Sequence, residues 1–156
     1  MRHIKDPRFQ PLYDALPEKT RAEFRPDGFF VTGDVARIDE RGYVHLVGRA
    51  RDLIISGGLN VYPKEVEEVL DSVEGVVESA VVGVPHPDFG EAVVAVVLRS
   101  PDRPGLTEQA VVATARERLA AYKTPKRVFF TDALPRNAMG KVQKNVLQER
   151  YRTLFD

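Results

Sequence analysis

Valine-rich runs dominate the second half of the chain. Residues 76–84, VVESAVVGV, and 91–100, EAVVAVVLRS, are nearly continuous apolar segments joined by the loop PHPDFG. Runs of this length, rich in β-branched residues and bounded by turn residues, are typical of buried strands. The segment PKRVFFTDAL at 125–134 has the same character. The pattern therefore predicts three strands in this region.

Helical periodicity marks the segments that alternate with these runs. Residues 63–75 open on a proline, end at a glycine and carry apolar residues at helical spacing. The inward-facing residues expected here are Val66, Val69, Leu70 and Val73. In residues 106–123 we expect Thr107 to cap a helix that faces inward through Val111, Ala115 and Leu119. Residues 143–155 predict a closing helix.

The first third of the chain has weaker patterns. Residues 28–50 predict a β-hairpin, because two loosely alternating segments flank the turn sequence DERG. Residues 52–62 predict a smaller hairpin with Gly57 and Gly58 in its turn. The proline-rich residues 1–27 offer one candidate helix, over 17–24. A lone hairpin is marginally stable in water, so we expect residues 28–50 to belong to a larger fold.

Together these elements predict an α+β fold, in which a small mixed β-sheet packs against about three helices. The hairpin at 28–50 precedes this sheet. We expect residues 1–50 to be the remnant of a large amino-terminal domain and residues 51–156 to form a separate carboxy-terminal domain. Only the second part has the apolar periodicity of a core, which suggests that the chain begins inside a bigger fold.

Composition excludes several classes of function. The 156 residues include 23 Lys plus Arg, 23 Asp plus Glu and no Cys. The balanced charge does not attract nucleic acid or an anionic membrane, and disulfides and thiolate metal sites are excluded. The three histidines lie far apart in sequence, so we expect no metal site. Since the longest apolar run, AVVAVVL, is too short to span a bilayer, we expect a cytoplasmic protein.

Lys141 is the first candidate for chemistry, because it follows a glycine in PRNAMGKVQKN, residues 135–145. A mononucleotide-binding P-loop needs a glycine where this chain has Pro135 and a hydroxyl group where it has Val142. That motif is therefore absent. On composition alone, a solvent-exposed surface lysine is the ordinary interpretation of Lys141.

Four stretches in series resemble the carboxy-terminal portion of the adenylate-forming superfamily, which includes acyl-CoA synthetases, luciferases and the adenylation domains of peptide synthetases. They are TGDVARIDERGYVHLVGRARD (32–52), ISGGLNVYPKEVEEVL (55–70), VVGVPHPDFGEAVVAVV (81–97) and LPRNAMGKVQK (134–144). The resemblance covers about residues 17–155, and the amino-acid sequence of these stretches is particularly similar to that of malonyl-CoA synthetases. It implies that a carboxylate attacks ATP to give an acyl-adenylate and pyrophosphate. The CoA thiol then displaces AMP, after the small domain has rotated.

The resemblance implies roles for four residues on the nucleotide side. Lys141 matches the adenylation lysine, whose ammonium on a mobile loop offsets the negative charge of carboxylate and nucleotide. Asp34 and Arg49 match residues that contact the ribose or phosphates; a turn aspartate and a surface arginine are the alternatives. Arg51 stands at the hinge position, where the family commonly has Asp or Lys.

On the CoA side, Ser56, Gly57 and Gly58 match the loop that lines the pantetheine tunnel, with a plain hairpin turn as the alternative. Relatives hold the CoA nucleotide with aromatic and basic residues. The residues at or next to those positions here are Phe89, Tyr122, Lys123, Lys126 and Arg127. An ordinary helix end with cations near the dipole explains residues 122–127 equally well. A related subgroup has an arginine where this chain has Thr124. Glu65 matches a family glutamate, and a capping role explains it more simply.

We therefore expect the carboxy-terminal part of an acid–thiol ligase of fatty acid metabolism, which uses ATP, Mg²⁺ and CoA on a small carboxylic acid. The Mg²⁺ site and the acyl pocket belong to the large amino-terminal domain, so we do not expect this chain alone to catalyse the reaction. Two alternatives remain: a stand-alone partner that supplies its lysine in trans, and a CoA- or nucleotide-binding module without ligase activity. The motif PRNAMGK also resembles the sequences that lysine acetyltransferases modify in relatives, with Lys141 as the acceptor.

Overall fold

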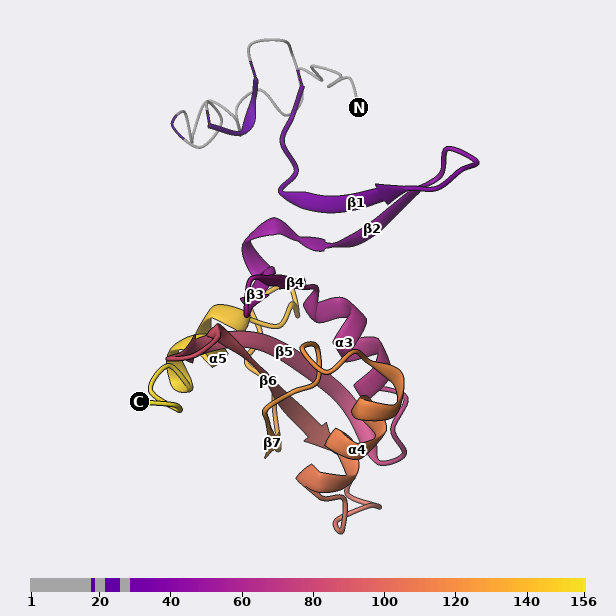
Figure 1. Cartoon of the computed structure of the whole chain (residues 1–156), viewed down its shortest axis with the longest axis vertical. Coiled ribbons are helices and arrows are strands. Elements are labelled where there is room, and N and C mark those ends of the chain that lie inside the picture. Colours follow the sequence, from indigo (N-terminus) through magenta and orange to yellow (C-terminus); the bar gives the residue numbers. More distant parts are fainter. Residues whose placement is uncertain (1–17, 19–21, 26–28) are drawn as a thin grey trace.

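The computed structural model describes residues 18, 22–25 and 29–156 (Figure 1). The helix predicted over 17–24 lies largely outside the described residues. None of the described helices is long and apolar enough to cross a membrane.

A five-stranded mixed sheet forms the centre of the domain (Figure 1). Strands β5 (Val76–His86) and β6 (Gly90–Arg99) pair antiparallel along most of their length, and β7 (Arg127–Thr131) pairs parallel with β6. The short strands β3 (Ile54–Ser56) and β4 (Leu59–Val61) pair with each other, and β3 joins the sheet beside β6. The predicted α+β class with a mixed sheet is confirmed.

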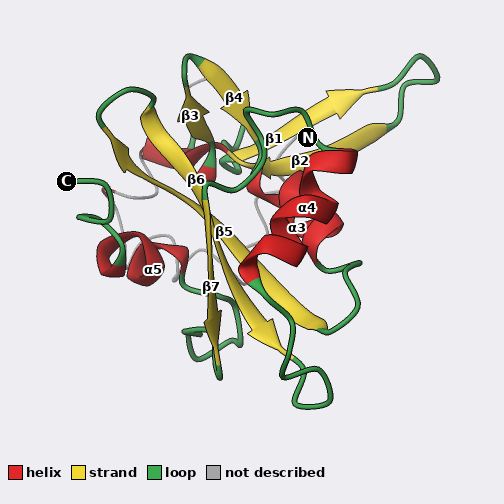
Figure 2. Cartoon of the chain, turned by 60° about the horizontal axis from the view of Figure 1, so that its bottom comes forward, coloured by secondary structure: helices red, strands yellow, loops and turns green. Residues whose placement is uncertain are grey.

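Helices cover both faces of this sheet (Figure 2). α3 (Pro63–Leu70) and α4 (Glu108–Arg118) pack on one face, and α5 (Lys144–Arg150) packs on the other. Because successive strand residues point to opposite faces, Val81 joins the cluster under α3 and α4, whereas Val82 joins the cluster under α5. Burial on both faces explains why β5 and β6 read as almost continuous valine runs.

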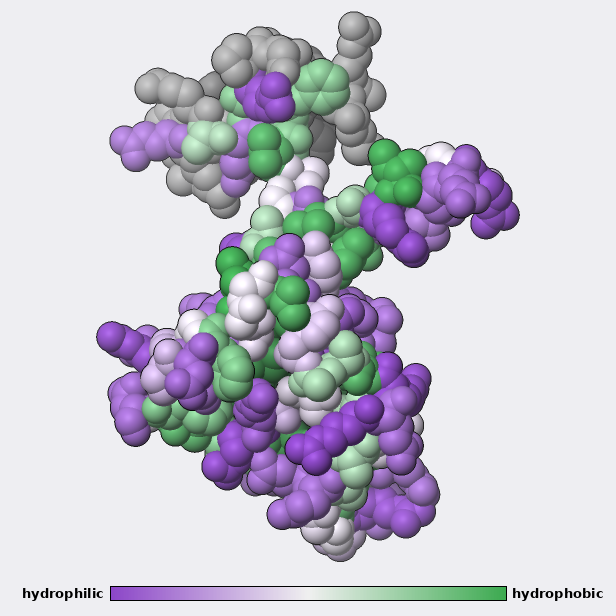
Figure 3. Space-filling model, in the orientation of Figure 1, coloured by the Kyte–Doolittle hydropathy of each residue, from purple (hydrophilic) through white to green (hydrophobic). Residues whose placement is uncertain are grey.

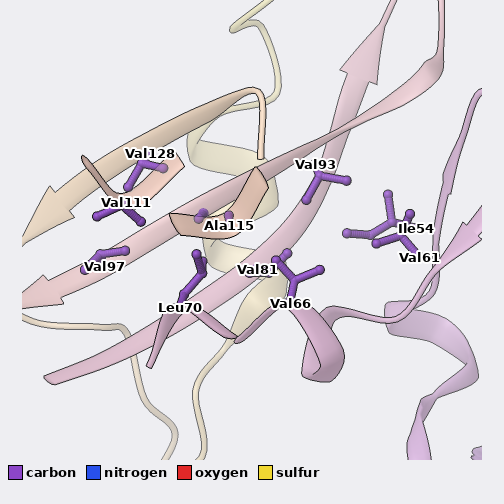
Figure 4. Close-up of a cluster of buried hydrophobic side chains, with 11 residues drawn as sticks. Ile54, Val61, Val66, Leu70, Val81, Val93, Val97, Val111, Ala115 and Val128 are labelled. Atoms are coloured by element: carbon purple, nitrogen blue, oxygen red, sulfur yellow. The ribbon is translucent and has the colours of Figure 1, made fainter. Parts of the chain in front are cut away.

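The larger of these two hydrophobic clusters lies between the sheet, α3 and α4 (Figure 4). Leu70 of α3 and Ala115 of α4 meet Val81, Val93 and Val97 of the sheet, and all five side chains are buried. The second cluster contains Leu147 of α5. The core therefore fixes the position of α5, which follows directly after the segment that carries Lys141.

The helix starts agree with the predictions, but the helix ends do not. α3 begins with Pro63, and the Thr107 Oγ1 accepts the N–H of Ala110 at 3.3 Å to cap α4. However, α3 stops at Leu70, α4 at Arg118 and α5 at Arg150. Leu119 ends α4 because its backbone is extended (φ −118°, ψ 149°). The chain then turns, so residues 120–123 are not helical as predicted.

The predicted first hairpin forms a separate two-stranded sheet of β1 (Asp34–Ile38) and β2 (Val44–Arg49). Large apolar side chains on it are exposed, among them Ile38, Val44 and Leu46, and Figure 3 shows hydrophobic side chains at the surface of this hairpin. A short 3₁₀-helix, η2 (Ala50–Asp52), connects it to β3. The hairpin was predicted over residues 28–50, but its first strand begins only at Asp34 and its second ends at Arg49.

Candidate functional site

Lys141 lies in the turn between β7 and α5, with an exposed side chain. Gly140, directly before it, has a φ of +77°, a left-handed conformation that glycine adopts without strain. The side-chain oxygen of Asn137 accepts the backbone N–H groups of Met139 and Lys141, both at 3.0 Å. The segment is thus closed by its own hydrogen bonds.

The Lys141 side chain lines a groove of about 500 Å³ together with Arg49, Arg51 and Lys144. Asp52 is the acidic residue in its lining, and the Arg51 guanidinium lies 3.6 Å from it with an 85% exposed side chain. Asp34 and Glu67, outside this lining, pair with Arg49 and Lys144, and Asp52 lies near Arg51. The described ion pairs do not include Lys141, so its ammonium gives the groove a positive charge, which suits a phosphate-bearing ligand. We call it the basic groove. It brings together three residues predicted to act on the nucleotide or at the hinge.

Asp34 and Arg49 contact each other, because the register of the hairpin places them opposite one another. The Arg49 Nε lies 2.8 Å from the Asp34 carboxylate, and another Arg49 nitrogen donates to the Thr32 carbonyl at 2.7 Å. The two residues predicted to bind the ribose or phosphates therefore form one ion pair in this structure. A ligand that uses both has to share or replace that contact.

Sequence reasoning missed Lys144, which also lines the basic groove. Its ammonium lies 2.7 Å from the carboxylate of Glu67, whose same oxygen accepts the N–H of Val81 at 2.8 Å. Glu67 is only 9% exposed. This contact ties the start of α5 to both α3 and β5. A signal was present: with Pro63, Val66 and Leu70, Glu67 occupies the buried helical face, where a charged residue needs a partner.

The predicted CoA-side residues fall into two groups, and the first is built around the β3–β4 turn. Gly57 and Gly58 have φ values of +58° and +79°. The Gly57 N–H donates to the Phe89 carbonyl at 2.8 Å, and the Lys126 ammonium lies 4.6 Å from the centre of the Phe89 ring. Ser56, directly before the turn, is buried. The structure thus places the exposed Phe89 ring and the Lys126 ammonium beside the glycine turn.

Tyr122 and Lys123 form the second group and line a different cleft, of about 650 Å³, between the first hairpin and α3. The Lys123 ammonium lies 2.5 Å from the Glu65 carboxylate and 5.7 Å from the Tyr122 ring centre. The hydrogen bond with Glu65 raises the pKa of Lys123 above its ordinary value. Glu65 therefore pairs with Lys123, in addition to lying in the first turn of α3.

Arg116 is a second residue that the sequence did not single out. It lines a cleft of about 400 Å³ at the end of α4, together with Lys126 and the buried Thr124. Arg127, in contrast, pairs with Glu108 at 3.0 Å. Arg116 and Lys126 thus provide two cations in one cleft beside Phe89.

Metal ligands are not gathered in the part of the chain that the structure describes. Within residues 18, 22–25 and 29–156 there is no cluster of three or more His, Asp or Glu residues able to hold a metal ion.

Comparison with known proteins decides the family. Residues 65–141 match the family model "AMP-binding enzyme C-terminal domain". The chain therefore contains an AMP-binding enzyme C-terminal domain. The predicted resemblance to the adenylate-forming superfamily is confirmed.

Curated relatives of this AMP-binding enzyme C-terminal domain are acyl-CoA ligases. The chain is 51% identical over 135 residues to the 3-[(3aS,4S,7aS)-7a-methyl-1,5-dioxo-octahydro-1H-inden-4-yl]propanoyl:CoA ligase of Rhodococcus jostii, with 85% of the chain and 26% of the relative covered. It is 47% identical to the long-chain-fatty-acid–CoA ligase FadD13 of Mycobacterium tuberculosis, covering 86% and 26%. The chain thus spans about a quarter of the length of these relatives.

Solved structures agree. ATP-bound MatB from Rhodopseudomonas palustris is 57% identical to the chain and superimposes with a TM-score of 0.82, covering 90% of this chain and 28% of MatB. The apo form of the same protein gives a TM-score of 0.71 at the same coverage. The chain thus corresponds to the carboxy-terminal domain of acyl-CoA ligases.

Proposed function

We propose that this domain is the mobile lid of an ATP-dependent acyl-CoA ligase, and that Lys141 is its adenylation residue. The observation that carries the proposal is the basic groove, where an exposed Lys141 side chain meets Arg49 and Arg51. A carboxylate that approaches ATP meets the negative charge of the triphosphate. An ammonium held at that point offsets the repulsion, and a single donor of this kind contributes about 3–4 kcal/mol, or about 10²–10³-fold in rate.

The nucleotide is proposed to lie along this groove. Asp34, which pairs with Arg49 beside this groove, accepts from the ribose hydroxyls, since a carboxylate has only acceptors and a ribose diol has two donors. Arg49 is already paired with Asp34, so it holds the Asp34 carboxylate in its orientation. Arg49 also faces the phosphates. ATP is the proposed co-substrate, and Mg²⁺ is assigned to the large amino-terminal domain, as the resemblance to the adenylate-forming superfamily implies.

Arg51 is the proposed hinge, at the boundary between residues 1–50 of the large domain and residues 51–156 of the lid. It lies in η2, where no described side chain is buried. The relative MatB fits less well in its apo form than in its ATP-bound form, which supports a change of arrangement between the two forms of that protein. A hinge needs backbone freedom rather than a particular catalytic group.

CoA is the proposed second co-substrate. Its pantetheine arm is assigned to the turn after Ser56, where glycines let a narrow ligand pass close to the backbone. Its nucleotide is assigned to Phe89 and Lys126, with Arg116 in the adjoining cleft as an additional phosphate partner. Tyr122 and Lys123 are proposed as weaker contacts of the CoA nucleotide, because the Lys123 ammonium is already paired with Glu65.

The acid is proposed to be a small carboxylate, and malonate is the first to test. This rests on the similarity to MatB and on the resemblance to malonyl-CoA synthetases. We propose that the ligase acts in the cytoplasm, in fatty acid metabolism. Because the Lys141 side chain is exposed, a lysine acetyltransferase is a proposed partner that switches off adenylation by removing its charge.

A domain exchange tests the proposal. The chain replaces the corresponding carboxy-terminal part of Rhodopseudomonas palustris MatB, and CoA thioester formation from malonate and ATP is measured. We expect activity with the wild-type chain, a loss of about 10²–10³-fold with Lys141→Ala, and no change with Arg103→Ala, which removes a surface cation paired with Glu74. An exchanged enzyme that works equally well with Lys141→Ala would refute the proposed role.

A further inference from the structure

Both peptide groups that flank Lys141 are held by hydrogen bonds from only two residues. The peptide group between Gly140 and Lys141 is bonded at both ends: an Arg136 guanidinium nitrogen donates to the Gly140 carbonyl at 2.6 Å, and Asn137 Oδ1 accepts the Lys141 N–H at 3.0 Å. On the other side of Lys141, its carbonyl accepts the backbone N–H of Asn137 at 2.9 Å. Hydrogen bonds on the peptide groups before and after Lys141 therefore restrain its backbone conformation.

Arg136 is itself anchored to the sheet. Another nitrogen of its guanidinium pairs with the Glu78 carboxylate on β5. Glu78 follows an irregularity in the β5–β6 register, and it lies 58 residues from Arg136 in sequence. The guanidinium thus joins the Lys141 turn to strand β5 of the sheet, a contact that suits its rigid fork of donors.

The direction of the Lys141 side chain depends on these two peptide groups. The ammonium lies at the end of a flexible four-carbon stem, so a small rotation at the backbone displaces it substantially. A displacement of about 1 Å in a group that acts on reacting atoms can lower a rate by about 10²-fold. Fixing the backbone narrows the volume that the ammonium samples.

We propose that Arg136 and Asn137 are positioning residues for Lys141 in the adenylation half-reaction. They act through the backbone of Lys141; Asn137 also lines the basic groove, whereas Arg136 is not among the lining residues of that groove. The turn keeps its shape relative to β5, so the ammonium reaches the reacting groups when the whole lid rotates rather than when the turn folds. This inference rests on the proposed function and adds the means by which Lys141 is aimed.

Amide hydrogen exchange of the whole chain, measured by NMR, tests the geometry directly. We expect Arg136→Gln to speed exchange of the Lys141 amide by about tenfold, because it releases the carbonyl end of the peptide group that carries this amide. We expect Asn137→Ala to speed both the Met139 and Lys141 amides, because it removes the acceptor that both share. Arg136→Lys, with one charged donor, recovers part of the protection. The matched control is Arg103→Gln, which removes another surface ion pair, with Glu74. Unchanged exchange at Lys141 in Arg136→Gln overturns the proposal.

The functional test uses the exchanged MatB enzyme and separates the two half-reactions. In Arg136→Gln and Asn137→Ala we expect the kcat of ATP–pyrophosphate exchange to fall about 10- to 100-fold, with the KM for ATP within about threefold. Thioester formation from presynthesised acyl-adenylate stays unchanged. If Lys141→Ala retains adenylation, the proposed function fails. If Lys141→Ala is inactive while Arg136→Gln and Asn137→Ala match the wild type, only the positioning role fails.

Discussion

The contact between Lys144 and Glu67 allows a quantitative test of how the turn and α5 are anchored. The Lys144 side chain is 20% exposed and the Glu67 side chain 12%, with 2.7 Å between the charged atoms. Lys144→Met removes the cation and leaves a carboxylate with the Val81 N–H as its described hydrogen-bond donor. Removing one partner of a buried pair costs about 3–5 kcal/mol. Because this pair retains some exposure, we expect the free energy of unfolding to fall by about 2–4 kcal/mol.

Urea unfolding followed by circular dichroism measures this loss. For an m-value of about 2 kcal/mol per molar urea, a loss of 3 kcal/mol lowers the midpoint by about 1.5 M. The double variant Lys144→Met/Glu67→Gln should recover most of the stability, because no uncompensated charge remains. The matched control is Lys64→Met, which breaks the exposed Lys64–Glu68 pair on α3, the helix that carries Glu67. It should lower the free energy of unfolding by less than about 0.5 kcal/mol. A loss below 1 kcal/mol in Lys144→Met, or a double variant weaker than both single variants, would refute the reasoning.

Three further predictions follow from the CoA side and from the Lys123 pair. Since Glu65 raises the pKa of Lys123 in the folded chain, the pair stabilises the fold below the ordinary lysine pKa and this contribution is lost as the pH rises through the folded value. Urea midpoints between about pH 9 and 11.5 should therefore fall more steeply in the wild type than in Glu65→Gln; parallel curves would contradict the pair. Gly58→Ala forces a side chain into a φ of +79° and should cost about 1 kcal/mol by urea unfolding, while an equal midpoint would argue against strain. In the exchanged MatB enzyme, Lys126→Ala should raise the KM for CoA several-fold and leave the KM for ATP unchanged; equal shifts in both would count against the CoA assignment.

Much of the fold was predictable because its signals are local. The valine runs of β5 and β6 identify strands buried on both faces, and Pro63 and Thr107 mark helix starts through their own backbone and side-chain chemistry. The helix ends were missed because tertiary packing decides them. Leu119 packs partly against the core in an extended conformation, which stops α4 before residues that the periodicity alone would continue.

The candidate site divides in the same way. Lys141 and the glycine turn could be selected from short motifs. The pairs that hold them, Arg136 with Glu78 and Lys144 with Glu67, join residues far apart in the chain, and no local pattern specifies such partners. Tyr122 and Lys123 were grouped with Lys126 because the family resemblance assigns all three to the CoA nucleotide. The turn after α4 directs them into a different cleft.

The central claim is that the Lys141 ammonium serves the first half-reaction and not the second. The most direct measurement compares both half-reactions in the exchanged MatB enzyme, with and without Lys141→Ala. With Lys141→Ala we expect ATP–pyrophosphate exchange to fall by about 10²–10³-fold, whereas thioester formation from presynthesised malonyl-adenylate and CoA stays within about twofold. A variant that loses both half-reactions equally, or neither, would contradict it.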